Sequence, residues 1–329
     1  MGDTRGSGTQ RRSATGLTLI LSEEDVEGLL DMDEVVGVVE EAFRRKGQGE
    51  AENFMRTRTR GASSVLNVMH ASMPYLGRAG VKAYLSSKAG AKFVVILFDT
   101  ADSAPLAVIA ADMLGRFRTG AASAVATKHL YRKTSAAVAI FGSGKQALTQ
   151  ILALGSVMSV EEVRVWSPNE RSRGAFAQTL GQKGFAARAF DSPERALGGA
   201  QVATAITSAH APFLDGGMLR DVSHANICGA NVPTHAEIST DAVASFQTVA
   251  VDDLAQAKFE YGELMRAAEA GRFSWDSAVE LGEVVAGRRQ PEGRTLFKSG
   301  GVAIEDVAVA SKLYELAKTE GEFQDVKIL

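Results

Sequence analysis

Apolar residues recur with helical spacing near the start of the chain. Ser22 and Glu24 precede Val26, and further apolar residues follow mostly three or four positions apart, as far as Val38. A serine before such a run is a helix-start signal, and this spacing places the apolar side chains on one helical face. The pattern predicts an N-terminal pair of helices, broken near residues 31–33.

Shorter apolar runs with strand character come next, separated by glycines. They cover residues 52–60, 65–69, 81–86 and 93–99. Arg56, Arg58 and Arg60 alternate within the first run, so on a strand they point to the same side. Lys82 lies inside the apolar stretch GVKAYL, where an unpaired ammonium group is costly. We therefore predict an anionic partner for Lys82.

The segment 110–130 changes from loop to a helix rich in small residues. We predict that this helix begins at about Thr119, directly after Arg118. The amides of the first helical turn have no partner within the helix and carry its positive dipole end. Thr119 and Gly120 are therefore predicted to form an anion-binding terminus.

Residues 137–155, AVAIFGSGKQALTQILALG, give the clearest motif, an apolar strand followed by a glycine turn and a helix. Gly142 and Gly144 allow the backbone to approach a pyrophosphate, and Ala147 stands where the fingerprint has a third small residue. Residues 163–167 resemble a second strand, which completes a β-α-β unit. This context predicts dinucleotide binding.

The rest of the chain alternates strands and helices. Strand-like runs occupy residues 186–190, 201–208, 224–231 and 246–253, and a helix is predicted from Ser192. The fold class is therefore α/β, a Rossmann-type doubly wound parallel sheet whose ligands lie beyond the carboxyl ends of the strands. Thr207, Ser208, Asn231 and Asp253 are predicted at such ends, and His224 opens a strand as a structural residue.

The C-terminal part of the chain is predicted to end in a helix that packs on the N-terminal part. Residues 282–292 are predicted as surface and turn, and residues 295–317 as a glycine loop that feeds an amphipathic helix. Glu305 and Asp306 fall in the first turns of that helix. We expect it to pack on the N-terminal part, whereas residues 1–16 are polar and glycine-rich and are expected to be a disordered tail.

Composition narrows the function classes. The 329 residues are 45% hydrophobic and 23% charged, and the net charge of −3 favours neither nucleic acid nor an anionic membrane as partner. A single cysteine, Cys228, fits a reducing compartment, so we expect a cytoplasmic protein. No apolar run is long enough to span a bilayer. The five histidines lack zinc-ligand spacing, so no metal site is expected.

The cofactor prediction follows from the end of the second Rossmann strand. An NAD-selective site has an acidic residue there, whereas this chain has Ser167, Asn169 and Arg171. Neutral groups beside a guanidinium suit a 2′-phosphate, so NADP(H) is favoured over NAD(H). The candidate cofactor-binding residues are Thr119, Gly142, Ser143, Gly144, Gln146, Ala147, Ser167, Asn169, Arg171, Thr207, Ser208 and Gly301.

Several blocks together resemble the ornithine cyclodeaminase/mu-crystallin family of NAD(P)-dependent oxidoreductases. They are NFMRTR, GVKAYL, RTGAASAVAT, AIFGSGKQA, VRVWS, ATAITS, HANICGAN, VDDLAQA and LFKSGGVAIEDVAVA, in family order from about residue 52 to 317. The resemblance implies a substrate-binding and dimerisation domain of α+β type, residues 17–120 plus 300–329. A Rossmann domain, residues 121–299, is inserted in it, and a homodimer is expected.

The resemblance also implies how a substrate is held. Family members bind the substrate α-carboxylate with Arg, Lys and Arg, which correspond here to Arg56, Lys82 and Arg118, with Arg58 as an alternative to Arg56. The chain departs from the cyclodeaminase pattern at Asn231, where that pattern has a catalytic aspartate, and at Asn67, where it has a second carboxylate. An amide is no general base at neutral pH, so ornithine cyclisation is disfavoured.

The predicted reaction is hydride transfer between a nicotinamide and the α-carbon of an imino or amino acid. The first choice is reduction of a cyclic ketimine or α-imino acid, such as Δ1-pyrroline-2-carboxylate or Δ1-piperideine-2-carboxylate, or an alanine-dehydrogenase-like reductive amination. The alternatives are an ornithine cyclodeaminase and a crystallin-like binding protein without turnover. Lys82, His70 or water is the candidate proton donor.

Overall fold

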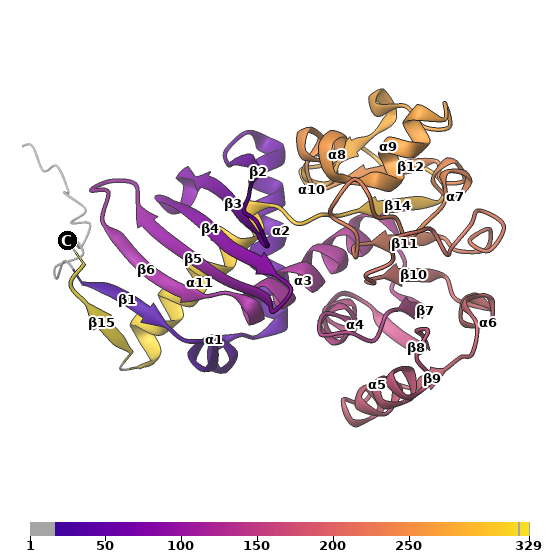
Figure 1. The fold of residues 1–329 in the computed structure, drawn as a ribbon, viewed down its shortest axis with the longest axis horizontal. Helices are drawn as coiled ribbons and strands as arrows, with labels where there is room; N and C mark the ends of the chain where they lie inside the picture. The colour runs from indigo at the N-terminus through magenta and orange to yellow at the C-terminus, as the bar shows by residue number, and fades with distance from the viewer. Residues whose placement is uncertain (1–16, 322, 329) are drawn as a thin grey trace, which may run out of the picture.

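The structure is a computed structural model that describes residues 17–321 and 323–328. The predicted disordered tail, residues 1–16, lies outside the described residues. The chain forms two sheets with helices around each (Figure 1). None of the helices in the described part of the chain combines the length and the apolar character needed to cross a membrane.

The first sheet has seven strands in the order β15-β1-β6-β5-β4-β3-β2. The four consecutive strands β2 to β5 were predicted from apolar runs separated by glycines, whereas β1, β6 and β15 were not. The bounds are β1 Thr18–Leu21, β2 Glu52–Arg60, β3 Ser64–Met73, β4 Arg78–Ser87, β5 Gly90–Asp99, β6 Pro105–Ala110 and β15 Gln324–Val326, with a short 3-10 helix, η1, at Pro74–Leu76.

Helices cover one face of this sheet. The predicted N-terminal pair is confirmed as α1 (Glu23–Leu29) and α2 (Met32–Gln48). Ser22 and Asp25 form a capping box at the start of α1, and the side chain of Asp31 caps α2. These caps explain the break between the two helices, because each helix begins at its own capping residue.

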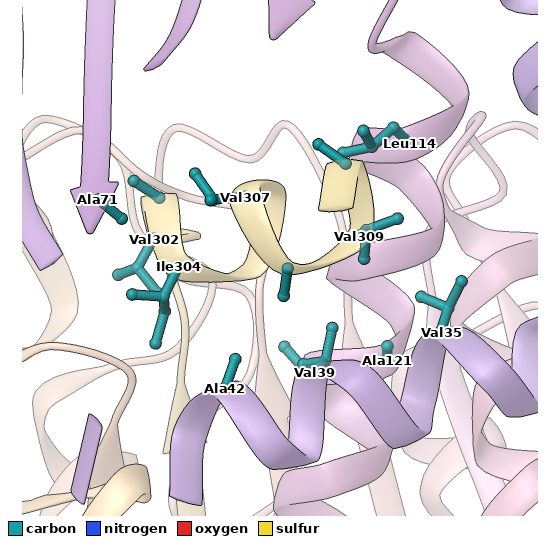
Figure 2. Packing of buried hydrophobic residues seen from close by; sticks show 14 of the residues in the cluster. Val35, Val39, Ala42, Ala71, Leu114, Ala121, Val302, Ile304, Val307 and Val309 are labelled. Atoms are coloured by element: carbon teal, nitrogen blue, oxygen red, sulfur yellow. The ribbon is translucent and has the colours of Figure 1, made fainter. Parts of the chain in front are cut away.

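The C-terminal helix α11 (Ala303–Glu320) crosses the same face of the sheet, against β3, β4 and β5 (Figure 1). It packs on the N-terminal part, as predicted. The prediction that it is amphipathic is wrong in its first half, where every residue from 303 to 311 is buried. Figure 2 shows the reason: Val39 and Ala42 of α2 and Leu114 of α3 enclose α11 from other sides.

The third helix, α3 (Asp112–Leu130), begins seven residues earlier than predicted. Both carboxylate oxygens of Glu23 accept hydrogen bonds from the first amides of α3, those of Asp112 at 2.7 Å and Met113 at 3.0 Å. A capping group far away in the sequence therefore sets the start. The predicted anion-binding terminus at Thr119 and Gly120 is wrong, because their amides lie inside a continuous helix.

The second sheet has eight strands in the order β13-β12-β14-β11-β10-β7-β8-β9, and every pair of neighbours is parallel. This confirms the predicted α/β class. The strands are β7 Ser135–Phe141, β8 Ser159–Trp166, β9 Ala187–Ala189, β10 Val202–Ala205, β11 His224–Ile227, β12 Thr248–Val251, β13 Val279–Glu280 and β14 Thr295–Lys298.

Helices lie on both faces of this sheet. They are α4 Ala147–Val157, α5 Glu170–Gln182, α6 Pro193–Leu197, α7 Thr240–Ala244, α8 Leu254–Glu260, α9 Gly262–Glu269 and α10 Leu281–Val285, with a 3-10 helix, η2, at Trp275–Ser277. Residues 282–285 are not the surface turn that was predicted, because they belong to α10 and Gly282 is buried against Gly47 of α2, whereas residues 287–290 are exposed as predicted. His224 is buried between Thr295 and Asn226, and burial lowers its pKa to about 4.

Candidate active site

The glycine turn between β7 and α4 has the shape that a dinucleotide needs. Gly142 has φ +110°, and a Cβ there would lie 2.5 Å from the carbonyl oxygen of Ile206. A Cβ on Gly144 would meet nothing within 4 Å, so open space lies beside this backbone. Ala147 is buried at the first position of α4. Open space beside a helix N-terminus fits a pyrophosphate.

The predicted adenosine end of the site lies after β8. The Ser143 hydroxyl donates to the Ser167 hydroxyl at 2.9 Å, which ties the glycine turn to this strand end. Asn169 caps α5 by accepting from the amide of Ser172 at 2.9 Å, and Arg171 is exposed. Arg173 was not predicted, yet its guanidinium donates to the carbonyl oxygen of Ser167 at 3.3 Å.

A cavity of about 190 Å³ opens at the carboxyl ends of β10, β11 and β14. It brings together seven of the predicted residues, from segments far apart in the sequence. Its lining residues are Arg118, Thr119, Gln146, Ile206, Thr207, Ser208, Cys228, Gly229, Asn231, Ser299, Gly300 and Gly301. The position agrees with the rule that ligands of parallel sheets bind beyond the carboxyl ends of the strands.

Arg56, on β2 of the other sheet, does not line this cavity but holds the Gly300–Gly301 loop that forms part of its wall. Its guanidinium donates to the carbonyl oxygens of Gly300 at 2.8 Å and Gly301 at 3.0 Å, and it pairs with Glu260 at 2.8 Å. Arg58 pairs with the other oxygen of Glu260 and donates to the carbonyl oxygen of Asn231 at 3.0 Å. Both arginines thus lie on one side of β2, as the alternation predicted.

Lys82 has the anionic partner that the sequence predicted. Its Nζ lies 2.7 Å from Oδ1 of Asp306, on the first turn of α11. Burial, with Arg118 and Arg56 nearby, lowers the pKa of Lys82 to about 8 against the opposing effect of Asp306. Burial alone would raise the pKa of Asp306, but Arg118 and Lys82 outweigh it and lower that pKa.

Arg118 joins the two acids of α11. Its Nε donates to Asp306 at 3.0 Å and its Nη1 to Glu305 at 2.8 Å. A Cβ on Gly301 would lie 2.2 Å from Nη1 of Arg118, so this glycine, with φ +77°, lets the backbone pass against the guanidinium. Gly301 therefore has a structural reason to be glycine besides its predicted contact with a cofactor.

Two further acids anchor the cavity walls and were not predicted as site residues. Asp252 accepts from the hydroxyl of Ser299 at 2.9 Å and from the amides of Gly300 at 3.0 Å and Gly301 at 2.9 Å. Glu237 accepts from the amides of Thr207 and Gly229, each at 2.7 Å. Both acids are buried. The only sequence signals for them were that Asp252 lies at the end of a predicted strand and that Glu237 lies shortly after the Gly229–Asn231 segment.

Other predicted residues lie elsewhere. His70 stacks on Phe54 at 4.8 Å, and both lie on the face of the sheet opposite Lys82. The suggestion that His70 is the proton donor to a substrate held by Lys82 is therefore wrong within this chain. Asn67 donates to the carbonyl oxygen of Val65 at 3.0 Å and to Ser86. Among the described residues, no group of three or more His, Cys, Asp and Glu side chains could hold a metal ion.

Comparisons with known proteins agree with this architecture. Residues 17–321 match the model of the ornithine cyclodeaminase/mu-crystallin family. An alanine dehydrogenase of Archaeoglobus fulgidus is 32% identical, over 94% of this chain and 98% of the relative. A Δ1-pyrroline-2-carboxylate reductase of Bacillus cereus is 30% identical, over 92% of this chain and 98% of the relative.

The fold comparison gives the same result. The structure of the Thermococcus litoralis Δ1-pyrroline-2-carboxylate reductase, in complex with NADH and L-proline, has a TM-score of 0.89 and 30% identity. The match covers 94% of this chain and all of that one (100%). The chain therefore belongs to the ornithine cyclodeaminase/mu-crystallin family.

Proposed function

We propose that this protein is an NAD(P)H-dependent oxidoreductase that reduces the C=N bond of a cyclic ketimine or α-imino acid, or performs the related reductive amination to alanine. One observation carries the proposal: Arg56 and Arg118 both contact the Gly300–Gly301 loop, beside the cavity that the glycine-turn residue Gln146 also lines. The named activities of the alanine dehydrogenase and of the Δ1-pyrroline-2-carboxylate reductase described above support the same reaction class.

In this proposal the three cations act on the substrate carboxylate. Guanidinium groups pair with a planar carboxylate through two parallel hydrogen bonds and so fix its orientation. Arg118 lines the cavity and is the principal contact, whereas Arg56 holds the Gly300–Gly301 wall and Lys82 adds positive charge. A bound NAD(P)H supplies the hydride. Lys82 provides the proton that the substrate nitrogen takes up, because its ammonium group is buried beside Arg118, which lowers its pKa to about 8.

Ornithine cyclodeamination is the second candidate reaction. It is disfavoured because Asn231, which lines the cavity, is an amide and accepts no proton at neutral pH. Asn67 is occupied by hydrogen bonds to Val65 and Ser86. A crystallin-like binding protein without turnover would not need Arg56, Lys82 and Arg118 gathered beside an intact dinucleotide turn. Both alternatives are distinguished by the assay described below.

We also propose that NADP(H) is preferred over NAD(H). Ser167 directly follows β8, at the place where an acidic side chain would repel a 2′-phosphate, and Arg173 donates a hydrogen bond to the carbonyl oxygen of Ser167. Arg171, the guanidinium predicted from the sequence, is exposed at the start of α5 and is free to turn toward a bound phosphate. The Thermococcus litoralis relative binds NADH, so this preference is a feature proposed for this chain.

The domain division remains a proposal, with residues 17–120 plus 300–329 for substrate binding and dimerisation and residues 121–299 for the dinucleotide. The two sheets support it, although α3 runs continuously through the boundary at residue 120. The proposed partners are an imino or amino acid and a second copy of the chain. Neither nucleic acid nor a membrane is proposed as a partner, and the proposed location is the cytoplasm.

The test is the oxidation of NADPH and NADH, followed by absorbance. The substrates are Δ1-pyrroline-2-carboxylate, Δ1-piperideine-2-carboxylate and pyruvate with ammonia, beside an assay of proline formed from ornithine. We expect oxidation with an imino acid, a lower KM for NADPH than for NADH, and no proline from ornithine. Proline formation would overturn the preference for a reductase, and no turnover with any substrate would favour the binding protein.

A further inference from the structure

Glu305 is a buried acid to which the proposed mechanism gives no part. It lies on the first turn of α11, with a relative exposure of 0%. One of its oxygens accepts from Arg118 at 2.8 Å, whereas the other, Oε1, has no hydrogen-bond partner. An ionised carboxylate with one bare oxygen in a dry interior is costly, so this geometry favours the neutral acid.

The charges around the Gly300–Gly301 loop balance if every group is ionised. This count covers the groups joined to Arg56 or Arg118 by ion pairs, and Asp252, which holds the loop; the Lys298–Glu263 pair and Glu237 are separate from it. Its four cations are Arg56, Arg58, Lys82 and Arg118, and its four acids are Glu260, Asp306, Asp252 and Glu305. A substrate carboxylate would then bring an uncompensated negative charge into a buried site. Binding is more favourable when one of the acids is neutral, because that leaves one positive charge for the ligand.

The hydrogen bonds single out which acid this is. Glu260 pairs with two arginines, and Asp306 pairs with Lys82 and Arg118. Asp252 accepts from two backbone amides and from the hydroxyls of Ser299 and Tyr261. These partners stabilise an ionised carboxylate. Oδ2 of Asp306 also lacks a hydrogen-bond partner, but its Oδ1 pairs with two cations. Glu305 pairs with one cation and is the least compensated of the four.

We propose that Glu305 is held as a neutral carboxylic acid in the working enzyme, and that the positive charge this leaves on Arg118 selects a substrate with one carboxylate. The inference rests on the proposed function, since it deepens the role of the Arg118 site. Glu305 acts through Arg118 and is therefore a positioning residue rather than a catalytic one.

The surroundings of Glu305 determine its pH dependence. The charged groups that face it are Arg118 from α3, Asp306 from its own helix and Asp252 from the end of β12. Lys82 of β4 pairs with Asp306. The side chains that α2 packs on α11 are apolar (Figure 2). Burial, with Asp252 and Asp306, raises the pKa of Glu305 to about 8 against the effect of Arg118. Above that pH Glu305 ionises and its negative charge neutralises the positive charge of Arg118, so Arg118 binds the substrate carboxylate more weakly.

The test compares the wild type with Glu305→Gln, which mimics the neutral acid at every pH. The probe is pyrrole-2-carboxylate, and its Kd is measured from about pH 6 to about pH 10 in the presence of NADPH. If binding requires a group to keep its proton, the Kd of the probe rises about tenfold for each pH unit above the pKa of that group. Because Lys82 also loses its charge near pH 8, the wild type should show the sum of two such effects and Glu305→Gln only one.

Two controls accompany this experiment. Glu34→Gln removes an exposed acid of α2 that pairs with Lys312 of α11, the helix that carries Glu305, and should leave the wild-type pH profile unchanged. Pyrrole-2-carboxamide, a neutral probe of the same shape, should bind without the pH dependence. Identical pH profiles for the wild type and Glu305→Gln would overturn the inference.

A second measurement needs no ligand, so it separates failure of the inference from failure of the proposed function. The native pKa of Glu305 lies above its ordinary value of 4.5, so the native state holds more protons than the unfolded state between these two pH values. The wild type should therefore lose stability relative to Glu305→Gln as pH rises from about 4.5 to about 8. A Tm difference that does not change with pH would overturn the inference, even if no probe binds.

Discussion

Lys82 lies where β4 passes the first turn of α11, and its partner Asp306 keeps a second ion pair with Arg118. Lys82→Met therefore removes the ammonium group without leaving the aspartate unpaired. If Lys82 supplies the proton, kcat should fall by about 10² or more, the usual contribution of a general acid. In the wild type, kcat should also fall above pH 8, because the pKa of about 8 marks the loss of the donated proton.

The measurement is the pH profile of kcat for the variant and the wild type, with circular dichroism as a check of folding. Lys92→Met is the matched control, because Lys92 is an exposed lysine of the neighbouring strand β5. Full turnover by Lys82→Met would remove this residue from the mechanism.

Asp252 is the residue that fixes the Ser299–Gly301 loop. An asparagine there has one acceptor oxygen, and its amide group would face the donors of the loop. For Asp252→Asn we expect a loss of about 2–3 kcal/mol in unfolding free energy, the range for a buried charged hydrogen bond. The KM for the imino acid should rise more than the Kd for NADPH, since the loop carries the carbonyl oxygens that hold Arg56.

Denaturant unfolding and steady-state kinetics check this prediction, with Asp221→Asn as control, because that side chain is 87% exposed. Equal changes in the KM of the imino acid and the Kd of NADPH would contradict the assigned role.

The sequence predicted that Lys82 needs an anion, because that follows from burial alone. It did not predict Asp306 or Asp252 as partners, because these contacts join distant parts of the chain.

At the scale of elements, α3 and α4 approach each other closely at Gly120. A Cβ at this position would lie 2.3 Å from the carbonyl oxygen of Thr149. Gly120→Ala should therefore destabilise the fold by about 1–3 kcal/mol, the cost of overpacking, despite the higher helix propensity of alanine. Because α4 begins at the glycine turn, we expect a weaker affinity for NADPH as well.

Gly174 in α5 is the matched control, because a Cβ there would meet nothing within 4 Å. Gly174→Ala should raise stability by about 0.5–1 kcal/mol, through helix propensity alone. Thermal unfolding of both variants tests the pair, and a stabilised Gly120→Ala would show that the two helices can separate without cost.

Local patterns predicted the elements whose signals are local. The strand-turn-helix at residues 135–157 and the capped pair α1 and α2 were recognised because glycines, caps and apolar spacing lie within them. The start of α3 was missed because its cap is Glu23, 89 residues earlier. The enclosure of α11 was missed because it depends on α2 and α3 packing against it, which no periodicity within α11 reveals.

At the scale of the whole molecule, the uncovered face of the seven-stranded sheet carries large apolar side chains. Phe54, Leu66 and Leu85 are 50%, 41% and 50% exposed, and they lie opposite the face that α11 covers. Exposed apolar side chains gathered on one sheet face are typical of a protein interface. We therefore expect the proposed homodimer to bury this face.

The double variant Leu66→Arg and Leu85→Arg places two charges on paired positions of β3 and β4. In a dimer joined through this face, four guanidinium groups would be buried without partners, a cost large enough to dissociate it. Light scattering after size-exclusion chromatography should give a dimer for the wild type and a monomer for the variant. Leu76→Arg, on η1 and 39% exposed, should remain a dimer. A wild type that is monomeric at assay concentrations, or a double variant that stays dimeric, would contradict this interface.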